Sequence, residues 1–415
     1  MILLSHPTAN QNVRQAALAL AETALLEEFW TCVNWKKGGL LDHLFAFLPR
    51  LRHELRRRSF PAELGPLIRT HSWQEWGRQA AGKLGWQRLT RNERGPFSVD
   101  AVYLGLDRRV ATRVRSGPEM KAVYAYDAGA LATFRAAKER GVMCIYEHPT
   151  IHWRMVREFQ REEAELHPEW APTLRALADS EEKLARKDEE LALADLVITA
   201  STFARDSVLC APGLKAPIRV VPYGSQPSVL SRSRRRESDR LRVIFVGALS
   251  QAKGLGYLLE AVARLGRRMD FTLVGRRISP AVPAPGVLDR YHWIPSLGHD
   301  ELLREMAQHD ALVLPSLHEG FGLVLTEAMS QGLVVITTPH TAAPDLINDG
   351  VDGFIVPIRS SAAIEEALTH LLDDRDRLAA MQEAAFRKAQ TLSWENYRRH
   401  LALLAREVVG RRVES

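Results

Sequence analysis

Two glutamates flank a glycine-containing turn in the segment LHEGFGLVLTEAMSQG, residues 317–332. Glu319 precedes the Gly-Phe-Gly turn at residues 320–322, and Glu327 lies in a helix expected over residues 323–331. The N–H groups at the start of a helix have no partner within the helix, and they carry a partial positive charge. The segment therefore predicts a phosphate site with a carboxylate on each side.

Apolar runs on both sides of this segment predict buried strands over residues 311–314 and 334–337. The three parts together form a strand, a turn, a helix and a second strand. In such a unit the helix begins at the carboxyl edge of the sheet, where ligands of parallel sheets bind. We therefore expect Glu319 to face a substrate.

Short apolar runs alternate with amphipathic helical patterns twice along the chain, which indicates an α/β protein with two parallel-sheet domains. The first group of expected strands is 1–4, 101–104, 122–125, 142–146, 196–200 and 219–221, with helices at 130–140 and 181–194. The second group is 243–246, 271–274, 311–314, 334–337 and 354–356, with helices at 255–265 and 300–308.

The segment PYGSQPSVLSRSRRRESD, residues 222–239, is rich in Pro, Ser and charge and has neither period, as expected of a linker between domains. We therefore predict an N-terminal domain over residues 1–224 and a C-terminal domain over residues 225–392. A last helix over residues 393–415, capped by Ser393, is expected to pack back on the first domain.

The length of 415 residues exceeds what one core usually organises, which also favours two domains. The sequence contains no run of about 18 uncharged apolar residues and no signal-peptide pattern at Met1, so we expect a cytoplasmic protein. Cys32, Cys144 and Cys210 are far apart and are expected to be reduced structural thiols.

Positive charge is concentrated near the N-terminus. The first 120 residues contain 18 Lys and Arg against 11 Asp and Glu, whereas the rest of the chain has 38 against 39. The densest stretch, residues 50–58, contains Arg50, Arg52 and three consecutive arginines at 56–58. This stretch could bind anionic lipid headgroups at the inner membrane face or a phosphorylated acceptor. The alternative is a solvated helix face, and nothing indicates a nucleic-acid partner.

Four sequence blocks in the C-terminal half carry a family resemblance. They are HEGFGLVLTEA (318–328), VGALSQAKG (246–254), PYG (222–224) and GVDGFIVP (350–357). Together they resemble family 4 retaining glycosyltransferases, the glycosyl transferases group 1. The resemblance implies the GT-B fold, in which two Rossmann-like domains face each other across a cleft. The N-terminal half matches more loosely, through EHPTIHW and the helix before residue 200.

The resemblance implies a nucleotide-diphosphate sugar as the donor. Glu327 would accept hydrogen bonds from the ribose hydroxyls, and Glu319 would reach the donor hexose. The backbone N–H groups of Phe321, Gly322 and Leu323 would bind the distal phosphate, an approach that Gly320 and Gly322 would permit because they lack a Cβ. The plainer alternative is that both carboxylates are solvated and that the glycines only turn the chain.

A second loop follows the strand at residues 243–246, where Gly247 shapes the chain and Lys253 would neutralise the leaving phosphate. The family often carries an arginine directly after this first glycine, whereas this chain has Ala248. Arg276 or Arg277, which follow the strand at residues 271–274, could replace the missing guanidinium.

In the N-terminal half, a histidine after the strand at residues 142–146 faces the transferred sugar in similar enzymes. His148 is the expected residue, with His152 and Glu147 as alternatives. Asn10 and Asn12, after the first strand, and Asp127, after the strand at residues 122–125, are weaker acceptor-side candidates whose alternatives are turn and capping roles.

The resemblance implies hexose transfer with retention of anomeric configuration to a glycan, a glycolipid or a small molecule. The departing phosphate takes the acceptor proton, and the protein supplies His148, Glu319 and Lys253. No cofactor or metal is expected, because the one Asp-x-Asp motif, at residues 374–376, lies in a polar helical stretch.

Two functions of other classes are alternatives. A dinucleotide-dependent oxidoreductase would also contain parallel sheets, but residues 1–12 lack Gly-x-Gly-x-x-Gly. A non-catalytic sugar-nucleotide-binding protein would share the GT-B fold and the donor site, and Ala248 is the feature that favours it.

Overall fold

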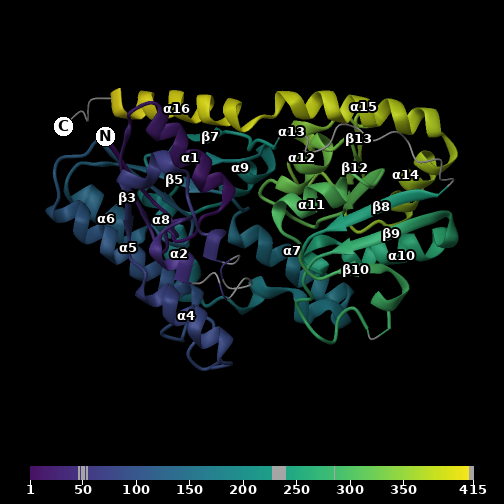
Figure 1. Cartoon of the computed structure of the whole chain (residues 1–415), viewed down its shortest axis with the longest axis horizontal. Coiled ribbons are helices and arrows are strands. Elements are labelled where there is room, and N and C mark those ends of the chain that lie inside the picture. The colour runs from purple at the N-terminus through teal and green to yellow at the C-terminus, as the bar shows by residue number, and fades with distance from the viewer. Residues whose placement is uncertain (45–46, 48–51, 53–54, 227–239, 285, 411–415) are drawn as a thin grey trace.

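The computed structural model describes residues 1–44, 47, 52, 55–226, 240–284 and 286–410. The chain forms two α/β units side by side, as Figure 1 shows, with the N-terminal unit in purple to teal and the C-terminal unit in green. Arg50 of the basic stretch and residues 227–239 of the expected linker lie outside the described residues.

The N-terminal sheet, within the described residues, has seven parallel strands in the order β3-β2-β1-β4-β5-β6-β7. The strand order reverses between β1 and β4, so the loops after these two strands border a crevice. The strands are β1 (Ile2–Ser5), β2 (Leu26–Thr31), β3 (Ile68–Thr70), β4 (Ala122–Tyr126), β5 (Met143–His148), β6 (Leu196–Thr199) and β7 (Ile218–Val220). Its helices are α1 (Gln11–Glu22), α2 (Leu40–Leu44), α4 (Trp73–Lys83), α5 (Val99–Ser116), α6 (Leu131–Glu139), α7 (Trp153–Leu166), α8 (Glu181–Leu193) and α9 (Thr202–Val208).

The C-terminal sheet has the order β10-β9-β8-β11-β12-β13 within the described residues, and its order reverses between β8 and β11. The strands are β8 (Leu241–Val246), β9 (Met269–Val274), β10 (His292–Ile294), β11 (Ala311–Leu314), β12 (Val334–Thr337) and β13 (Gly353–Ile355). The helices are α10 (Leu255–Leu265), α11 (His299–Met306), α12 (Leu323–Ser330), α13 (Ala343–Leu346), α14 (Ser361–Asp373), α15 (Arg375–Thr391) and α16 (Trp394–Gly410).

The expected strand at residues 101–104 is wrong, because these residues lie in α5. Ser98 caps this helix by accepting a hydrogen bond from the N–H of Ala101 at 3.1 Å. The apolar run AVYL is one part of a longer amphipathic pattern, which places Val102 and Leu106 in the core. The strands β2, β3 and β10 were not predicted.

The central strands are buried on both faces, which explains their continuous apolar sequences. In β11 and β12 every residue is buried. The buried apolar side chains form a cluster that extends from Phe29 and Tyr124 of the N-terminal unit to Phe245 and Phe321 of the C-terminal unit. The two units therefore share a continuous apolar core.

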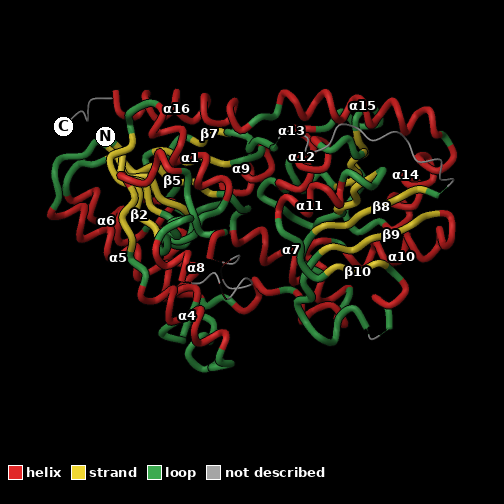
Figure 2. Tube along the Cα trace, in the orientation of Figure 1, coloured by secondary structure: helices red, strands yellow, loops and turns green. Residues whose placement is uncertain are grey.

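The two C-terminal helices run along one edge of the molecule, α15 beside the C-terminal unit and α16 beside the N-terminal unit (Figures 1 and 2). On α16, Arg398 forms an ion pair with Glu22 of α1 at 3.0 Å and donates to Gln15 at 2.6 Å. The last helix thus packs on α1 of the N-terminal unit, although it directly follows α15 of the C-terminal unit in the sequence.

Helix α7 joins the two units through one buried carboxylate. Glu163, fully buried, accepts hydrogen bonds from Gln251 at 2.7 Å, Tyr257 at 2.8 Å and Arg359 at 2.9 Å. All three donors belong to the C-terminal unit. A charge-assisted hydrogen bond inside a protein is stronger than a neutral one, so this carboxylate is a principal anchor between the units.

No helix among the described residues is both long enough and apolar enough to cross a membrane. All three cysteines are free thiols, with Cys32 and Cys144 buried and Cys210 exposed.

Candidate active site

Two loops meet where the strand order of the C-terminal sheet reverses. One follows β8 and carries Lys253, and the other follows β11 and carries Glu319. The Lys253 ammonium forms an ion pair with Glu319 Oε1, and the Ser316 hydroxyl donates to the same oxygen at 3.1 Å. The structure therefore brings together two residues that the sequence separates by 66 positions.

Burial lowers the pKa of Lys253 to about 8. The ammonium nevertheless pairs with the Glu319 carboxylate. A partly desolvated ammonium attracts a phosphate strongly, because the opposite charges of the two groups are weakly screened by water at such a site.

The turn between Glu319 and α12 presents backbone donors. Gly322 has φ of +86°, the left-handed conformation that glycine adopts without strain. In the part of the chain that the structure describes, the N–H groups of Phe321, Gly322 and Leu323 donate no hydrogen bond to a protein acceptor. These groups lie at the positive end of α12, so they can bind an anion.

Gly320 has a different role from the one expected. A Cβ on this residue would overlap the carbonyl oxygen of Pro149 in the N-terminal unit. The Ser201 hydroxyl also donates to the Gly320 carbonyl at 2.6 Å. Glycine is therefore required here for contact between the two units. Gly322 and its neighbours remain the candidates for binding a phosphate.

Glu327 of α12 lines a cavity of about 1030 Å³ between the two units. Its carboxylate lies 2.9 Å from His299 Nε2 at the start of α11. Burial raises the pKa of Glu327, and the nearby His299 opposes this effect. On the N-terminal side, Asn10 lines the same cavity.

The loop with Ala248 runs beside the loop after β9. The N–H of Leu249 donates to the carbonyl oxygen of Arg276 at 3.0 Å. Arg277 is engaged, because its guanidinium donates to the carbonyl oxygens of Pro280 and Pro283 at 2.8 Å each. Arg276 is exposed, so it is the arginine that remains available in place of the missing one.

Comparison with known proteins agrees with this geometry. Residues 229–388 match the model of the family described as glycosyl transferases group 1. The match covers both loops, from Lys253 to Glu327. The C-terminal domain is a group 1 glycosyltransferase domain.

Curated relatives of the chain are also glycosyltransferases. D-inositol 3-phosphate glycosyltransferase of Corynebacterium aurimucosum is 30% identical over 53% of this chain and 59% of that protein. MMP alpha-(1->4)-mannosyltransferase of Mycolicibacterium hassiacum is 26% identical over 60% of this chain and 62% of that protein. The chain thus matches less than two thirds of the length of these relatives.

Solved structures extend the likeness to the N-terminal unit. Sucrose-phosphate synthase of Thermosynechococcus elongatus has a TM-score of 0.66 at 18% identity, covering 98% of both chains. Anabaena Alr3699/HepE in complex with UDP and glucose has a TM-score of 0.60 at 17% identity, covering 97% of this chain and 98% of that chain. Both units of the chain together therefore form the GT-B fold.

His148 ends β5 and lies directly before Pro149, which contacts Gly320. The His148 side chain is buried, and neither ring nitrogen makes a hydrogen bond within the described part of the chain. Burial lowers the pKa of His148 to about 4, so the imidazole is neutral at physiological pH. An uncharged imidazole can bind a sugar hydroxyl, but both ring nitrogens of His148 are buried in this structure and the residue does not line the cavity of about 1030 Å³.

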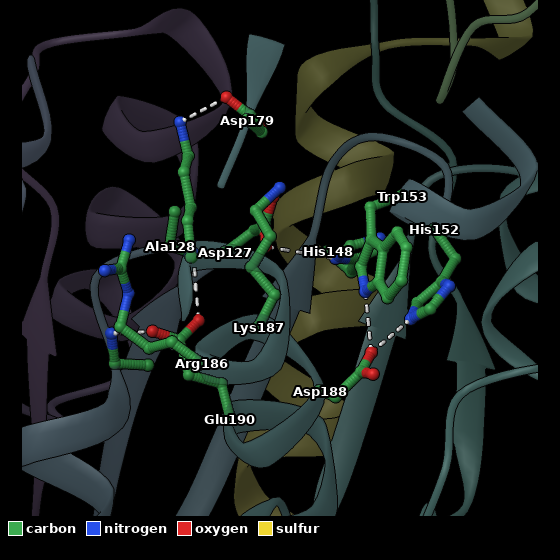
Figure 3. A network of polar contacts seen from close by, with 12 residues as sticks. Asp127, Ala128, His148, His152, Trp153, Asp179, Arg186, Lys187, Asp188 and Glu190 are labelled. Carbon is green, nitrogen blue, oxygen red and sulfur yellow. Dashed lines mark hydrogen bonds and ion pairs between the residues drawn. The ribbon is translucent and has the colours of Figure 1, made fainter. Parts of the chain in front are cut away.

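Asp127 follows β4 and lies near His148 (Figure 3). Neither residue is among those that line the cavity of about 1030 Å³. One Asp127 oxygen is 3.9 Å from His148 Nδ1, and the other is 3.0 Å from the Lys187 ammonium. Burial alone would raise the pKa of Asp127, but Lys187 and then His148 lower it below its ordinary value. Asp127 is therefore a charged residue held by Lys187 and Tyr146, near His148 but without a hydrogen bond to it.

The remaining acceptor-side candidates have structural roles. Asn12 is buried and donates to Tyr223 at 3.2 Å, so the expectation that it lines the cleft is wrong. His152 caps α7 and contacts Asp188 at 3.0 Å (Figure 3), also away from the cavity. Glu147 accepts from the Tyr223 hydroxyl at 2.6 Å, and burial raises its pKa.

Sequence reasoning missed several buried carboxylates. Glu190 accepts hydrogen bonds from the N–H groups of Ala128, Ala130 and Leu131 at the start of α6, and burial raises the pKa of Glu190 to about 8. No sequence signal distinguishes Glu190, because it lies in a helix of alternating charge. His299 was missed for a similar reason, since it begins the polar helix α11.

No group of three or more His, Cys, Asp or Glu side chains in the described part of the chain could hold a metal ion. Asp374 of the Asp-x-Asp motif caps α15 by accepting from the N–H of Arg377 at 2.8 Å.

Proposed function

We propose that the protein is a retaining, metal-independent glycosyltransferase that moves a hexose from a nucleotide-diphosphate sugar to an acceptor hydroxyl. The observation that carries the proposal is the pairing of Lys253 with Glu319 beside the unoccupied N–H groups that begin α12. A cation and several N–H groups at one sheet edge suit a diphosphate. The names of the curated relatives support sugar transfer.

In the proposed reaction the bond between the sugar C1 and the phosphate oxygen breaks, and a bond between C1 and the acceptor oxygen forms on the same face. The acceptor proton moves to the departing phosphate. Lys253 and the N–H groups of residues 321–323 stabilise the negative charge that grows on this phosphate. Glu319 and His148 bind sugar hydroxyls, Glu327 binds the ribose, and Arg276 assists at the diphosphate.

A non-catalytic sugar-nucleotide-binding function is less well supported. Ala248 is the feature that favours it, and Arg276 beside the same loop offers a replacement for the missing guanidinium. A binding protein would also have no need for a desolvated lysine at the leaving group, since such a lysine contributes most as charge develops.

A donor hydrolysis assay tests the proposal. The full chain is incubated with UDP, GDP and ADP sugars without acceptor, and released nucleotide is measured. We expect slow release from one nucleotide class and its loss in Lys253→Ala. Binding of a nucleotide sugar with neither hydrolysis nor transfer to any tested acceptor would instead support the non-catalytic function.

A further inference from the structure

The two walls of the interdomain cavity differ in charge. The N-terminal wall carries six cationic side chains against one acidic residue, Glu75; the cations are Arg14, Lys37, Arg56, Arg57, Arg58 and Arg78. The C-terminal wall carries Asp300, Glu301 and Glu327 against Arg304, with His299 beside them. A cavity with such opposed walls orients a charged ligand.

Half of these cations already have carboxylate partners. Arg56 pairs with the buried Asp42 at 2.7 Å. Arg78 pairs with Glu75 at 2.8 Å, and Arg58 lies 3.5 Å from the same carboxylate. Of these pairs, Arg56–Asp42 joins the arginine-containing segment to α2, and Arg58–Glu75 joins it to α4.

The other three cations have no such partner. Among the described residues, no acidic side chain pairs with Arg14, Lys37 or Arg57. Arg14 donates to the carbonyl oxygen of Arg57, and its Nε is buried without a hydrogen-bond partner. Burial and then the neighbouring Arg57 lower the pKa of Arg14. A desolvated guanidinium beside a second cation is unfavourable unless an anion binds.

We propose that Arg14, Lys37 and Arg57 form a subsite for a phosphate group, or a similar oxyanion, on the acceptor. This inference rests on the proposed transferase function. The planar guanidinium donors match phosphate oxygens in pairs, and Lys37 adds a point charge. Arg14 lies one turn of α1 after Asn10, which also lines the cavity, so the anion would be held on the wall opposite Glu327.

The same chemistry could come from a soluble phosphorylated acceptor or from an anionic lipid headgroup. Arg57 and Lys37 are both exposed, so either source can reach them. Among the described arginines of the basic stretch, Arg52 and Arg56 pair with Asp42 and Arg58 lies near Glu75, which leaves Arg57 as the cavity-lining arginine without a carboxylate partner.

Phosphate titration tests the subsite directly. Binding of inorganic phosphate to the full chain is measured by calorimetry in the wild type and in Lys37→Ser/Arg57→Ser. The matched control is Lys36→Ser/Arg108→Ser, which removes two exposed cations outside the cavity lining. The titrations are repeated with Lys253→Ala in each protein, so that phosphate at the donor loop does not contribute. We expect the cavity variant to lose at least tenfold in phosphate affinity and the control to lose none.

Vesicle sedimentation separates the two sources. Binding to phosphatidylglycerol but not phosphatidylcholine vesicles, lost in the cavity variant, would support a lipid headgroup. Phosphate binding without vesicle binding would support a soluble acceptor. Equal phosphate affinity in the wild type and the cavity variant would overturn the proposal. The proposal would also be overturned if the cavity variant lost as much affinity for a nucleotide diphosphate as for inorganic phosphate, because the cations would then bind the donor. Failure of the transferase function itself would appear separately, as absent donor hydrolysis.

Discussion

The protonation of Lys253 should control the pH dependence of catalysis. With a pKa of about 8, about nine tenths of the molecules carry the ammonium at pH 7 and about one tenth at pH 9. The ammonium stabilises the departing phosphate, so its loss removes a charge-assisted contact. We therefore expect kcat/KM for donor hydrolysis to fall about tenfold between pH 7 and pH 9.

The assay is a profile of kcat/KM for nucleotide release, since this parameter reports the pKa of the free enzyme. Lys253→Arg is the matched variant, because a guanidinium stays charged over this range. It should be slower than the wild type but should show no fall between pH 7 and pH 9. Lys253→Met should lose about 10- to 100-fold at pH 7, as expected for a charge-assisted contact of about 1.5–3 kcal/mol. A flat wild-type profile, or the same fall in Lys253→Arg, would refute the reasoning.

Three further substitutions test the rest of the site. Glu327→Ala should weaken nucleotide-sugar binding about 100-fold or more by calorimetry, because each lost hydrogen bond to a charged group contributes about 1.5–3 kcal/mol; unchanged affinity would mean that the ribose assignment is wrong. Gly320→Ala should destabilise the protein by about 1–3 kcal/mol in urea unfolding, and it should also lower donor hydrolysis, because the added methyl group meets the Pro149 backbone. The control is Gly65→Ala, because no atom lies within 4 Å of a methyl group at that position. Glu163→Ala should destabilise by about 3–5 kcal/mol, since it leaves the Arg359 guanidinium without one buried partner, and Glu163→Gln should cost less; equal unfolding midpoints would contradict the anchoring role.

The C-terminal half was largely predictable from the sequence because its local signals agree with its fold. The helix expected over residues 255–265 has those bounds in the structure. The loops with Lys253 and Glu319 follow neighbouring strands, as the strand order requires. Here apolar runs, turn glycines and helix starts all indicate the same arrangement.

The N-terminal half was harder because its strands contain charge. In β2, the sequence LEEFWT places Glu28 inside the sheet, where it accepts from Trp30 Nε1 at 2.8 Å and pairs with Arg113 at 3.0 Å. A partner 85 positions away cannot be read from a local pattern. Likewise, Asn10 and Asn12 are only two positions apart at the start of α1, but they lie on different sides of the helix. Asn10 lines the cavity, whereas Asn12 donates to the Tyr223 hydroxyl.

The packing of α16 on α1 means that the N-terminal unit is not continuous in sequence, because it contains residues from both ends of the chain. The chain passes from one unit to the other twice, and the two crossings touch, because the N–H of Ser225 donates to the carbonyl oxygen of Leu392 at 2.7 Å. Deleting everything after residue 224 would uncover the α1 surface that α16 protects, including the contacts of Gln15 and Glu22. An isolated N-terminal unit would therefore need residues 394–410 joined back to it, as in a circular permutant, before it could fold and be studied alone.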